Sequence, residues 1–600
     1  MVIVMDLKIK LRFLDLAGKF LRGDLQNLCA YDFTPHKSAS KDYPPDQLIP
    51  HTQPEKTGIP SSYIESFYRD LSAAKGLNPH GALIIRQGKI IAQGYWAPYS
   101  AERIHELYSL SKTFAGTAVG LAIEEGFLTL DDTLQDIFPD KWNALFHLFQ
   151  KPITIRHLLT MSTGIFFNEA ATVLEKNWLQ SILESECAFP PGTNFSYNSL
   201  NTYLLSAIIK RKTGEGLMEF LKPRLLDPLH ITSAVWDLCP MGVEKGGWGL
   251  SMTLYDAAKL GVLYLDRGIW KYGDQPLRIL PEWWVQEATS QQIATHSTAS
   301  PQGYGYQIWT FPAKGAYEFN GIFNQHIIVL PQHDMVIALF CGNKSLFPSN
   351  HIVDLIVQYF GDQHVFPTSV KPVRKDVKSL AATLEKLTLH QPCPPVTVQS
   401  FWDKLMRGFP RAPHPQPPYI PDALIQIEGK TFRFEKNTAG LLPLVLQAIH
   451  TNFTPGISSV RLSFAGGHLT FTVTEGQNTN IFTAGLDKTP LYSRLTFAGE
   501  TYIVAAIAQL GKTASGRDQI TIQITFVETP CTRVLRCIIQ DHSLLIRMDE
   551  IPSAHDVMTG LGQMMNNGHP LHDKMISAFA HNTQDRLHKV LLPRIIGHME

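Results

Sequence analysis

The chain has 600 residues, enough for three or more domains at about 100–200 residues per domain. Apolar residues make up 44% and charged residues 18%, a composition that excludes disordered, collagen-like and coiled-coil chains. Lys and Arg together number 53, as do Asp and Glu, so the formal charge is zero and offers no electrostatic case for binding nucleic acid or an anionic membrane.

Cysteine usage and apolar runs indicate the compartment. The seven cysteines form no CxxC pair, which argues against a zinc or thioredoxin-type site and predicts free thiols in a reducing compartment. The first apolar run, Val2 to Met5, is too short for a secretory signal. The sequence contains no run of 18 apolar residues, so we expect no membrane helix. We therefore expect a soluble, cytoplasmic protein without a membrane partner. The sequence leaves the oligomeric state open.

The first third of the chain begins with an extension and continues into alternating element types. Residues 1–53 are predicted to be an N-terminal extension with a short amphipathic helix around Leu7 to Leu21. Ser61 or Ser62 can cap a helix from Tyr63 to Ala74. Next, two β-branched runs flank Arg86-Gln87-Gly88-Lys89 and predict a β-hairpin.

The following segments complete this domain, which we place at residues 54–365. The apolar stretch from Ser109 to Glu125 ends at Gly126 and predicts a buried helix. Helical stretches continue to about Asp266, and strands return after Tyr304. The pattern predicts an α/β or α+β domain whose sheet is built from both ends of the domain.

The amino-acid composition and pattern change twice in the last third of the chain. Residues 366–421 are rich in proline and predict a linker, with one helix near Ser379 to Leu387. Residues 422–600 contain short alternating runs broken by Gly, Asn and Asp, which predict an antiparallel sandwich or barrel. The histidine-rich last 35 residues are predicted to form a polar helical tail, and we expect no metal site there.

The tetrapeptide Ser109-Leu110-Ser111-Lys112 carries chemistry at the start of the apolar helix. Residues i and i+3 share a helix face, so Ser109 Oγ and Lys112 Nζ can meet. A serine hydroxyl needs an adjacent base to act as a nucleophile, and a buried lysine can be that base. The same SxxK pattern also occurs at Ser38–Lys41 and Ser72–Lys75, but neither of these opens a long apolar helix.

Two further motifs follow along the chain, and each could supply a group that such chemistry needs. Tyr197-Asn198-Ser199 comes after a Pro-Pro-Gly turn, where a phenol could relay a proton. Phe319-Asn320-Gly321 precedes a strand, and its glycine would let a substrate lie against the strand edge. The backbone N–H of Ile322 could then stabilise an oxyanion together with that of Ser109. Each motif alone could equally be an ordinary turn or a packed loop.

Taken together, these motifs resemble the serine β-lactamase/DD-peptidase superfamily. Within it, the chain resembles the class C-like serine hydrolases and the group of 6-aminohexanoate-dimer hydrolase and related esterases. The resemblance spans about residues 57–362 and rests on HELYSLSKTFAGTAVG, ITIRHLLTMSTG, PPGTNFSYNS, GGWGLSMTLYDAAKLG and GYGYQIW. It implies a helical cluster on an antiparallel sheet and an acyl-enzyme mechanism without metal or cofactor. The short alternating runs of the C-terminal domain resemble the strands of lipocalin-like barrels.

The resemblance implies roles for individual residues. Ser109 would be the nucleophile, Lys112 the base and Tyr197 the proton relay, with the N–H groups of Ser109 and Ile322 as the oxyanion hole. The candidate substrate-binding residues are Ser199, Asn320, Gly321, Trp248 and Tyr306. Ser199 stands where class C β-lactamases have Asn, and Phe319 stands where they have Lys, which argues against efficient β-lactam hydrolysis.

We therefore expect a serine hydrolase that cleaves amide or ester bonds of a small molecule. A catalytically weak binding or sensor protein, and a D-aminopeptidase or transacylase, remain alternatives. His105 and His157 could form a Ser-His arrangement with Ser109, although we interpret them as structural histidines.

Overall fold

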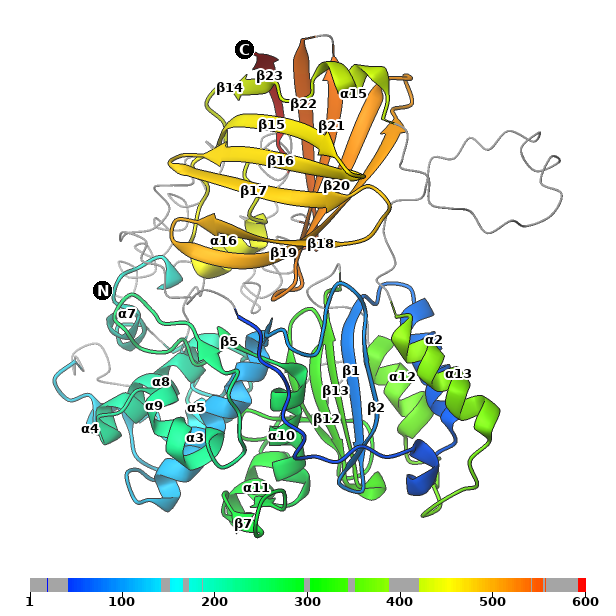
Figure 1. Ribbon diagram of the computed structural model, residues 1–600. Helices are drawn as coiled ribbons and strands as arrows, with labels where there is room; N and C mark the ends of the chain where they lie inside the picture. The colour runs from blue at the N-terminus through cyan, green and yellow to red at the C-terminus, as the bar shows by residue number, and fades with distance from the viewer. Residues whose placement is uncertain are drawn as a thin grey trace.

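The computed structural model describes most of the chain as two domains, one above the other in Figure 1. The described residues are 41–141, 152–165, 172–185, 187–295, 303–343, 351–387, 420–540, 542–553 and 592–600, with Lys19 and Asp556. Apart from Lys19, the helix predicted around Leu7 to Leu21 lies outside these residues, as do four of the five C-terminal histidines.

An eight-stranded antiparallel sheet forms the centre of the first domain. Its spatial order is β2 (Lys89–Tyr95), β1 (Pro79–Arg86), β13 (Met335–Cys341), β12 (Gln325–Leu330), β11 (Tyr317–Gly321), β10 (Trp309–Thr310), β9 (Gly303–Tyr304) and β8 (Ile293–Ala294). The predicted hairpin is confirmed as β1 and β2, joined through Gln87 and Gly88, which both have positive φ. Strand β1 pairs with β13, so the two ends of the domain meet in one sheet, as expected.

Helices cover both faces of this sheet (Figure 1). One face carries α2 (Ser61–Ala73), α12 (His351–Phe360) and α13 (Arg374–Glu385). The other side holds a helical cluster: α3 (Ser111–Glu124), α4 (Leu134–Ile137), α5 (Ile155–Leu159), α7 (Trp178–Leu183), α8 (Ser199–Thr213), α9 (Leu217–Leu221), η4 (Lys222–Leu226), α10 (Leu254–Leu265) and α11 (Glu282–Thr289). This arrangement confirms the predicted sheet with a helical cluster.

The predicted buried helix is α3, and it starts two residues later than the SxxK motif. A 3-10 turn, η3 (Tyr108–Leu110), carries Ser109, and α3 begins at Ser111. Nearly every residue of α3 is buried, so the helix is apolar on all sides rather than amphipathic, as a central helix should be.

Shorter elements connect these layers. Strands β3 (His105–Glu106), β5 (Leu250–Met252) and β4 (Val235–Trp236) form a small sheet beside η3. The remaining short elements are η2 (Pro54–Thr57), β6 (Ile269–Trp270), β7 (Leu277–Arg278) and η5 (Pro331–His333). Within the described residues, no helix is long and apolar enough to cross a bilayer.

The described part of the predicted linker is attached to the first domain. Helix α13 lies near the expected position, and the carboxylate of Glu65 on α2 accepts hydrogen bonds from Ser379 and Thr383 on α13. Residues 388–419, which include most of the prolines, lie outside the described residues. The domain boundaries stay predictions.

The second domain is a closed barrel, one of the two expected architectures. Its strands are β14 (Thr431–Phe434), β15 (Ile457–Ala465), β16 (His468–Glu475), β17 (Asn478–Gly485), β18 (Leu491–Phe497), β19 (Glu500–Lys512), β20 (Asp518–Phe526), β21 (Thr532–Gln540), β22 (Ser543–Ile551) and β23 (Arg594–Met599). The ring closes where β17 meets β19, at Gly485 and Ile507. Two helices accompany the strands, α15 (Asp422–Gln426) and α16 (Leu444–His450).

The predicted helical tail is wrong for the end of the chain. Residues Arg594 to Met599 form β23, which pairs with β14 on one side and β22 on the other. Burial alternates along β23, with Ile595 inside the barrel and Ile596 outside, as expected for a strand with one apolar face. Without β23, the barrel would leave two open edges.

A buried ion pair fixes α16 to the barrel wall. Arg533 Nη1 lies 2.8 Å from Glu550 Oε2, and both side chains are almost fully buried. The same carboxylate oxygen accepts the N–H of Leu444 at the start of α16, and Arg533 Nη2 donates to the carbonyl of Leu442. The pair therefore joins β21 and β22 to α16.

We predict that Glu550→Ala lowers the free energy of unfolding of the barrel by about 3–5 kcal/mol, because the Arg533 guanidinium would stay buried without its partner. Urea unfolding followed by circular dichroism measures this. The matched control is Asp549→Ala, whose carboxylate faces Arg536 at 3.6 Å at the surface and should cost less than about 1 kcal/mol. Equal losses in both variants would contradict the role of the buried pair.

Candidate active site

The side chains of Ser109 and Lys112 meet at the start of α3. Lys112 Nζ lies 2.8 Å from Ser109 Oγ, 3.2 Å from Ser199 Oγ and 2.8 Å from the carbonyl oxygen of Gly247. The Lys112 side chain is buried, whereas Ser109 is half-buried. Three oxygen atoms therefore surround one buried amine.

These three contacts suit the lysine in both of its protonation states. An ammonium group has three N–H donors, one for each oxygen. A neutral amine keeps two donors and gains a lone pair, which can accept the Ser109 hydroxyl proton while the N–H groups stay on Ser199 and Gly247. The site can therefore take the proton from Ser109 without rearranging.

Local backbone structure places each partner. Ser199 is the first residue of α8, whose N-cap Asn198 accepts the N–H of Leu200 through its side chain. Gly247 lies against Ser199, and a Cβ atom at this position would be 2.4 Å from the Ser199 carbonyl oxygen. Only a glycine lets this segment approach closely enough for its carbonyl to reach Lys112.

Gly321 brings strand β11 against the nucleophile in the same way. A Cβ atom on Gly321 would lie 2.4 Å from the carbonyl oxygen of Leu107 and 3.2 Å from the backbone nitrogen of Ser109. The next residue, Ile322, begins the turn to β12, and Gln325 Nε2 donates to its carbonyl oxygen. The backbone around Gly321 and Ile322 thus borders the backbone N–H of Ser109.

Tyr197 joins the same group through its ring. Lys112 Nζ lies over the Tyr197 ring, 4.8 Å from the centroid, a cation–π contact when the amine is charged. Tyr197 stacks on Trp309 at 5.5 Å between centroids, and Phe195 and Tyr304 pack around Trp309. Burial, together with the neighbouring Tyr197, raises the pKa of Tyr304 well above its ordinary value, so Tyr304 stays protonated.

The other predicted site residues lie apart from this group to different degrees. Trp248 follows Gly247 and stacks on Trp178 at 5.6 Å. The hydroxyl of Tyr306 accepts a hydrogen bond from Arg156 and donates to Glu287. Asn320 donates to Glu318, and strand alternation places both on the face of β11 opposite to Gly321.

Phe319 is the first residue of the Phe319-Asn320-Gly321 motif and stands where class C β-lactamases have a lysine. Its side chain is fully buried in the core of the helical cluster and packs edge-on against Tyr264 at 5.3 Å. A lysine would not be accommodated here without losing its hydration.

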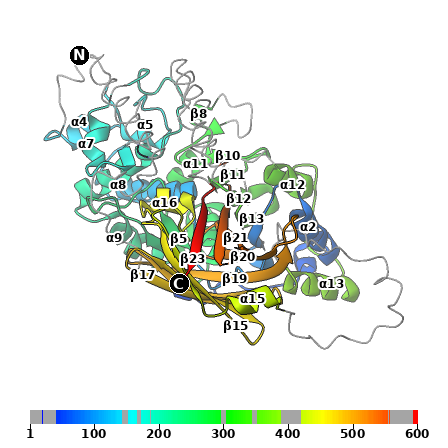
Figure 2. The same ribbon diagram turned by 90° about the horizontal axis from the view of Figure 1, so that it is seen from above.

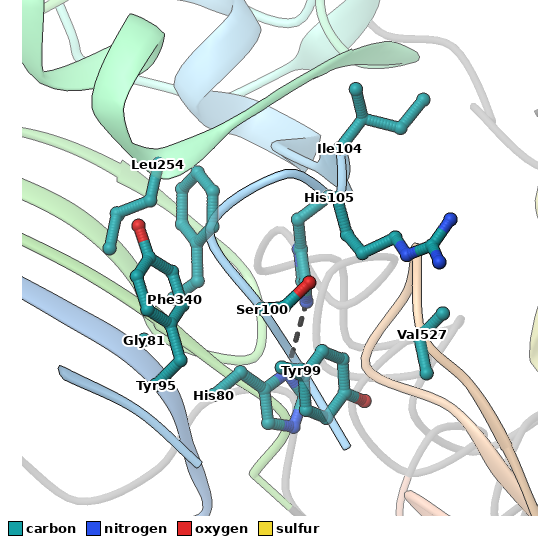
Figure 3. Close-up of a pocket in the computed structure, with 11 residues that line it drawn as sticks. His80, Gly81, Tyr95, Tyr99, Ser100, Ile104, His105, Leu254, Phe340 and Val527 are labelled. Atoms are coloured by element: carbon teal, nitrogen blue, oxygen red, sulfur yellow. Dashed lines mark hydrogen bonds between the residues drawn. The ribbon is translucent and has the colours of Figure 1, made fainter. Parts of the chain in front are cut away.

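The histidine alternative does not fit the contacts. His105 Nδ1 lies 2.9 Å from the carbonyl oxygen of Glu106 and therefore donates to it, which leaves Nε2 to accept from His80 Nδ1 at 3.0 Å, the dashed line in Figure 3. Burial and the neighbouring His105 lower the pKa of His80 well below its ordinary value, so this pair is neutral. His157 Nδ1 accepts the N–H of Thr154 and caps α5. Both are structural histidines.

The remaining sequence features are structural too. Ser72, from one of the other SxxK sequences, donates to the carbonyl of Tyr68 and accepts from the Trp96 indole. The described cysteines, 187, 239, 341, 531 and 537, are free thiols. The described residues contain no group of three or more His, Cys, Asp or Glu side chains placed to hold a metal ion.

Sequence reasoning missed Gly247, Phe195 and Tyr304 as members of this site. The Gly246-Gly247 pair was a usable signal, because consecutive glycines often mark a close backbone approach. No sequence signal distinguishes Phe195 and Tyr304 from other buried aromatic residues.

Comparisons with known proteins find similarity over the first domain. The family model described as Beta-lactamase matches residues 64–351. The 6-aminohexanoate-dimer hydrolase of Paenarthrobacter ureafaciens is 27% identical over 286 residues, which cover 43% of this chain and 70% of that protein.

Two solved structures are also similar. The octameric penicillin-binding protein homologue from Pyrococcus abyssi is 17% identical and covers 81% of this chain and 98% of its own, with a TM-score of 0.40. EstCE1, a hydrolase with promiscuous acyltransferase activity, is 17% identical and covers 50% of this chain and 99% of its own, with a TM-score of 0.44.

We predict that Gly321→Ala slows modification of Ser109 by a fluorophosphonate probe by about 100-fold or more, because the new Cβ pushes β11 away from the backbone N–H of Ser109. Intact-mass spectrometry over time measures the rate. Gly511→Ala is the control, since a Cβ there meets no atom within 4 Å. An unchanged rate in Gly321→Ala would show that the close approach of β11 does not matter.

Proposed function

Because residues 64–351 form a domain of the serine β-lactamase and penicillin-binding-protein-like superfamily, we propose that the protein hydrolyses amide or ester bonds of small molecules through an acyl-enzyme at Ser109. The observation that carries this proposal is the 2.8 Å contact between Lys112 Nζ and Ser109 Oγ, beside the backbone N–H of Ser109. The contact supplies a nucleophile and its base, and the N–H supplies a donor for the developing charge.

In the first step, Ser109 Oγ attacks the substrate carbonyl and its proton passes to Lys112 Nζ. Ser109 Oγ lies within hydrogen-bond reach of this amine, and the neutral amine carries the lone pair that accepts the proton. The resulting ammonium is stabilised by Ser199 Oγ, the Gly247 carbonyl and the Tyr197 ring. The Lys112 amine therefore has partners in the site both as a neutral group and as an ammonium.

The tetrahedral intermediate places a negative charge on the former carbonyl oxygen. We assign its stabilisation to the backbone N–H groups of Ser109 and Ile322, which preorganised elements hold in place. Lys112 then returns the proton to the leaving amine or alcohol, and Tyr197 relays it. Water releases the acid from Ser109 by the same relay in reverse.

The surroundings favour a neutral, partly apolar acyl group. Phe319 removes the cation that would hold a β-lactam or peptide carboxylate, and the half-buried rings of Tyr197, Phe195 and Trp309 form an apolar wall beside Lys112. The related protein from Paenarthrobacter ureafaciens is named as a hydrolase of the 6-aminohexanoate dimer. We therefore propose small linear amides or esters rather than β-lactams as substrates.

We predict that Ser109→Ala abolishes both the fluorophosphonate adduct and the turnover of p-nitrophenyl esters, while the fold stays intact by circular dichroism. Intact-mass spectrometry and ester hydrolysis measure the two effects. Continued turnover in Ser109→Ala would refute the proposed nucleophile. A persistent acyl adduct from the ester without turnover in the unaltered protein would instead indicate a binding or sensor protein.

We predict that Trp309→Ala reduces the preference for a phenylacetyl over an acetyl p-nitrophenyl ester by about tenfold, because an apolar pocket contact of this size is worth about 1–3 kcal/mol. The ratio of kcat/KM for the two esters measures the effect. Trp283→Ala, which changes a partly exposed tryptophan on α11, is the matched control. An unchanged ratio in Trp309→Ala would place the acyl group elsewhere.

A further inference from the structure

A buried charged cluster lies where α16 of the barrel meets β3 of the first domain. His450, the last residue of α16, places Nε2 3.6 Å from Glu106 Oε2 and Nδ1 3.5 Å from Asp237 Oδ2. Lys245 Nζ lies 3.4 Å from the same Asp237 oxygen and donates to the carbonyl of Ile449 on α16. All four charged side chains are nearly or fully buried.

This cluster is directly connected to the catalytic groups through short stretches of backbone. Glu106 precedes Ser109 by three residues, and its N–H donates to the carbonyl of Glu528 in the barrel at 2.9 Å. Lys245 precedes Gly247 by two residues, and Gly247 accepts the hydrogen bond from Lys112 Nζ. The end of α16 therefore contacts both segments that place the nucleophile and its base.

Apolar contacts of the barrel hold the same segments. Tyr108 and Phe323 flank the proposed oxyanion hole, are fully buried and belong to the hydrophobic core of the barrel rather than to that of the helical cluster. Their rings meet edge-on at 5.1 Å. Both have positive φ, an uncommon conformation for bulky residues that persists only where surrounding packing enforces it.

We propose that His450 of the barrel is a positioning residue of the active site, which as an imidazolium holds Glu106 and Asp237 and thereby the segments that carry Ser109 and Gly247. This inference rests on the proposed function, because it assigns a role in the same reaction. His450 touches neither Ser109 nor Lys112 and acts through the backbone.

The charge balance of the cluster favours the imidazolium form. Lys245 offsets one carboxylate, so a neutral His450 would leave Glu106 and Asp237 with a single cation between them, at a high desolvation cost. Burial by itself lowers the pKa of His450, but the carboxylates of Glu106, Asp237 and Glu500 outweigh burial and raise it above its ordinary value. Tyr502 on β19 also faces His450, with its ring 6.1 Å from the imidazole.

The sign of the pH effect follows from this raised pKa. In the unfolded chain, His450 has a pKa of about 6.5. Its contribution is therefore fully present below about pH 6.5 and is lost as the pH rises through the higher pKa of the folded state. The loosening should therefore occur on the alkaline side of the pKa of His450.

The test compares fluorophosphonate modification of Ser109 in the full-length protein and in His450→Gln from pH 5.5 to 9.5. We expect the variant to react about tenfold more slowly at pH 6 and at the same rate above the pKa of His450, because the wild-type protein then loses the same charge. His468→Gln, at an exposed position on β16, should match the wild type throughout. A purely structural role would give a rate ratio that does not change with pH, and that result would overturn the proposal.

Glu106→Gln tests the same contact from the other domain. If His450 acts through Glu106, the double variant His450→Gln/Glu106→Gln should react at about the rate of the slower single variant. A double variant that is slowed by the product of the two single effects would show that the residues act independently, and would contradict the coupling. If the wild-type protein takes no adduct, or Ser109→Ala takes one, the proposed nucleophile is wrong instead, so the two failures are distinguishable.

Hydrogen exchange of the wild-type protein decides the question if these variants do not fold. After correction for intrinsic exchange, we expect amide protection over residues 104–112 to fall as the pH rises through the pKa of His450. Unchanged protection would overturn the proposal.

Discussion

The burial of the Lys112 amine is the constraint on which the rest of the site depends. An amine removed from water must find polar partners, and three oxygens from three separate segments supply them: Ser109, Ser199 and Gly247. The helix that carries Lys112 is itself buried, so each partner has to be brought to it by another element. The first turn of α8 and the Gly246-Gly247 segment approach α3 for this reason.

Two glycines make this convergence sterically possible. Gly247 lies against the carbonyl of Ser199, and Gly321 lies against the backbone of η3, in both cases closer than any Cβ atom would allow. These approaches bring backbone groups, rather than side chains, next to the reacting atoms. Backbone groups held by helices and strands need little reorganisation during a reaction, which suits the stabilisation of a developing charge.

The barrel does more than cover the first domain, because it contacts the segment just before Ser109. Helix α16 lies at the side of the barrel that faces the first domain (Figures 1 and 2). The barrel also surrounds Tyr108 and Phe323, pairs its Glu528 carbonyl with Glu106, and places the end of α16 on Lys245. Hydrogen bonds from Tyr99 to Thr529 and from Tyr492 to Pro98 add to this interface. Val527 of the barrel also lines the small cavity beside His80 and His105 (Figure 3). Apolar, hydrogen-bonded and charged contacts thus converge on the segment just before the nucleophile.

The sequence by itself determined the features that depend on near neighbours in the chain. The spacing of Ser109 and Lys112, the hairpin turn at Gln87 and Gly88, and the alternating strands of the second domain each follow from local geometry, and the structure contains all of them. The C-terminal strand β23 escaped prediction because its short pattern makes sense only once β14 and β22 offer it two free edges.

Only the tertiary structure decided which distant groups complete the site. Gly247 as an acceptor for Lys112, the hydrogen bond of Tyr306 with Arg156, and the contact of His450 with Glu106 all join residues far apart in sequence. Side-chain periodicity reports which face of an element is buried, but it carries no information about which other element will cover that face. Those pairings are settled by packing of the whole chain, where burying charged and polar groups requires each one to meet a partner.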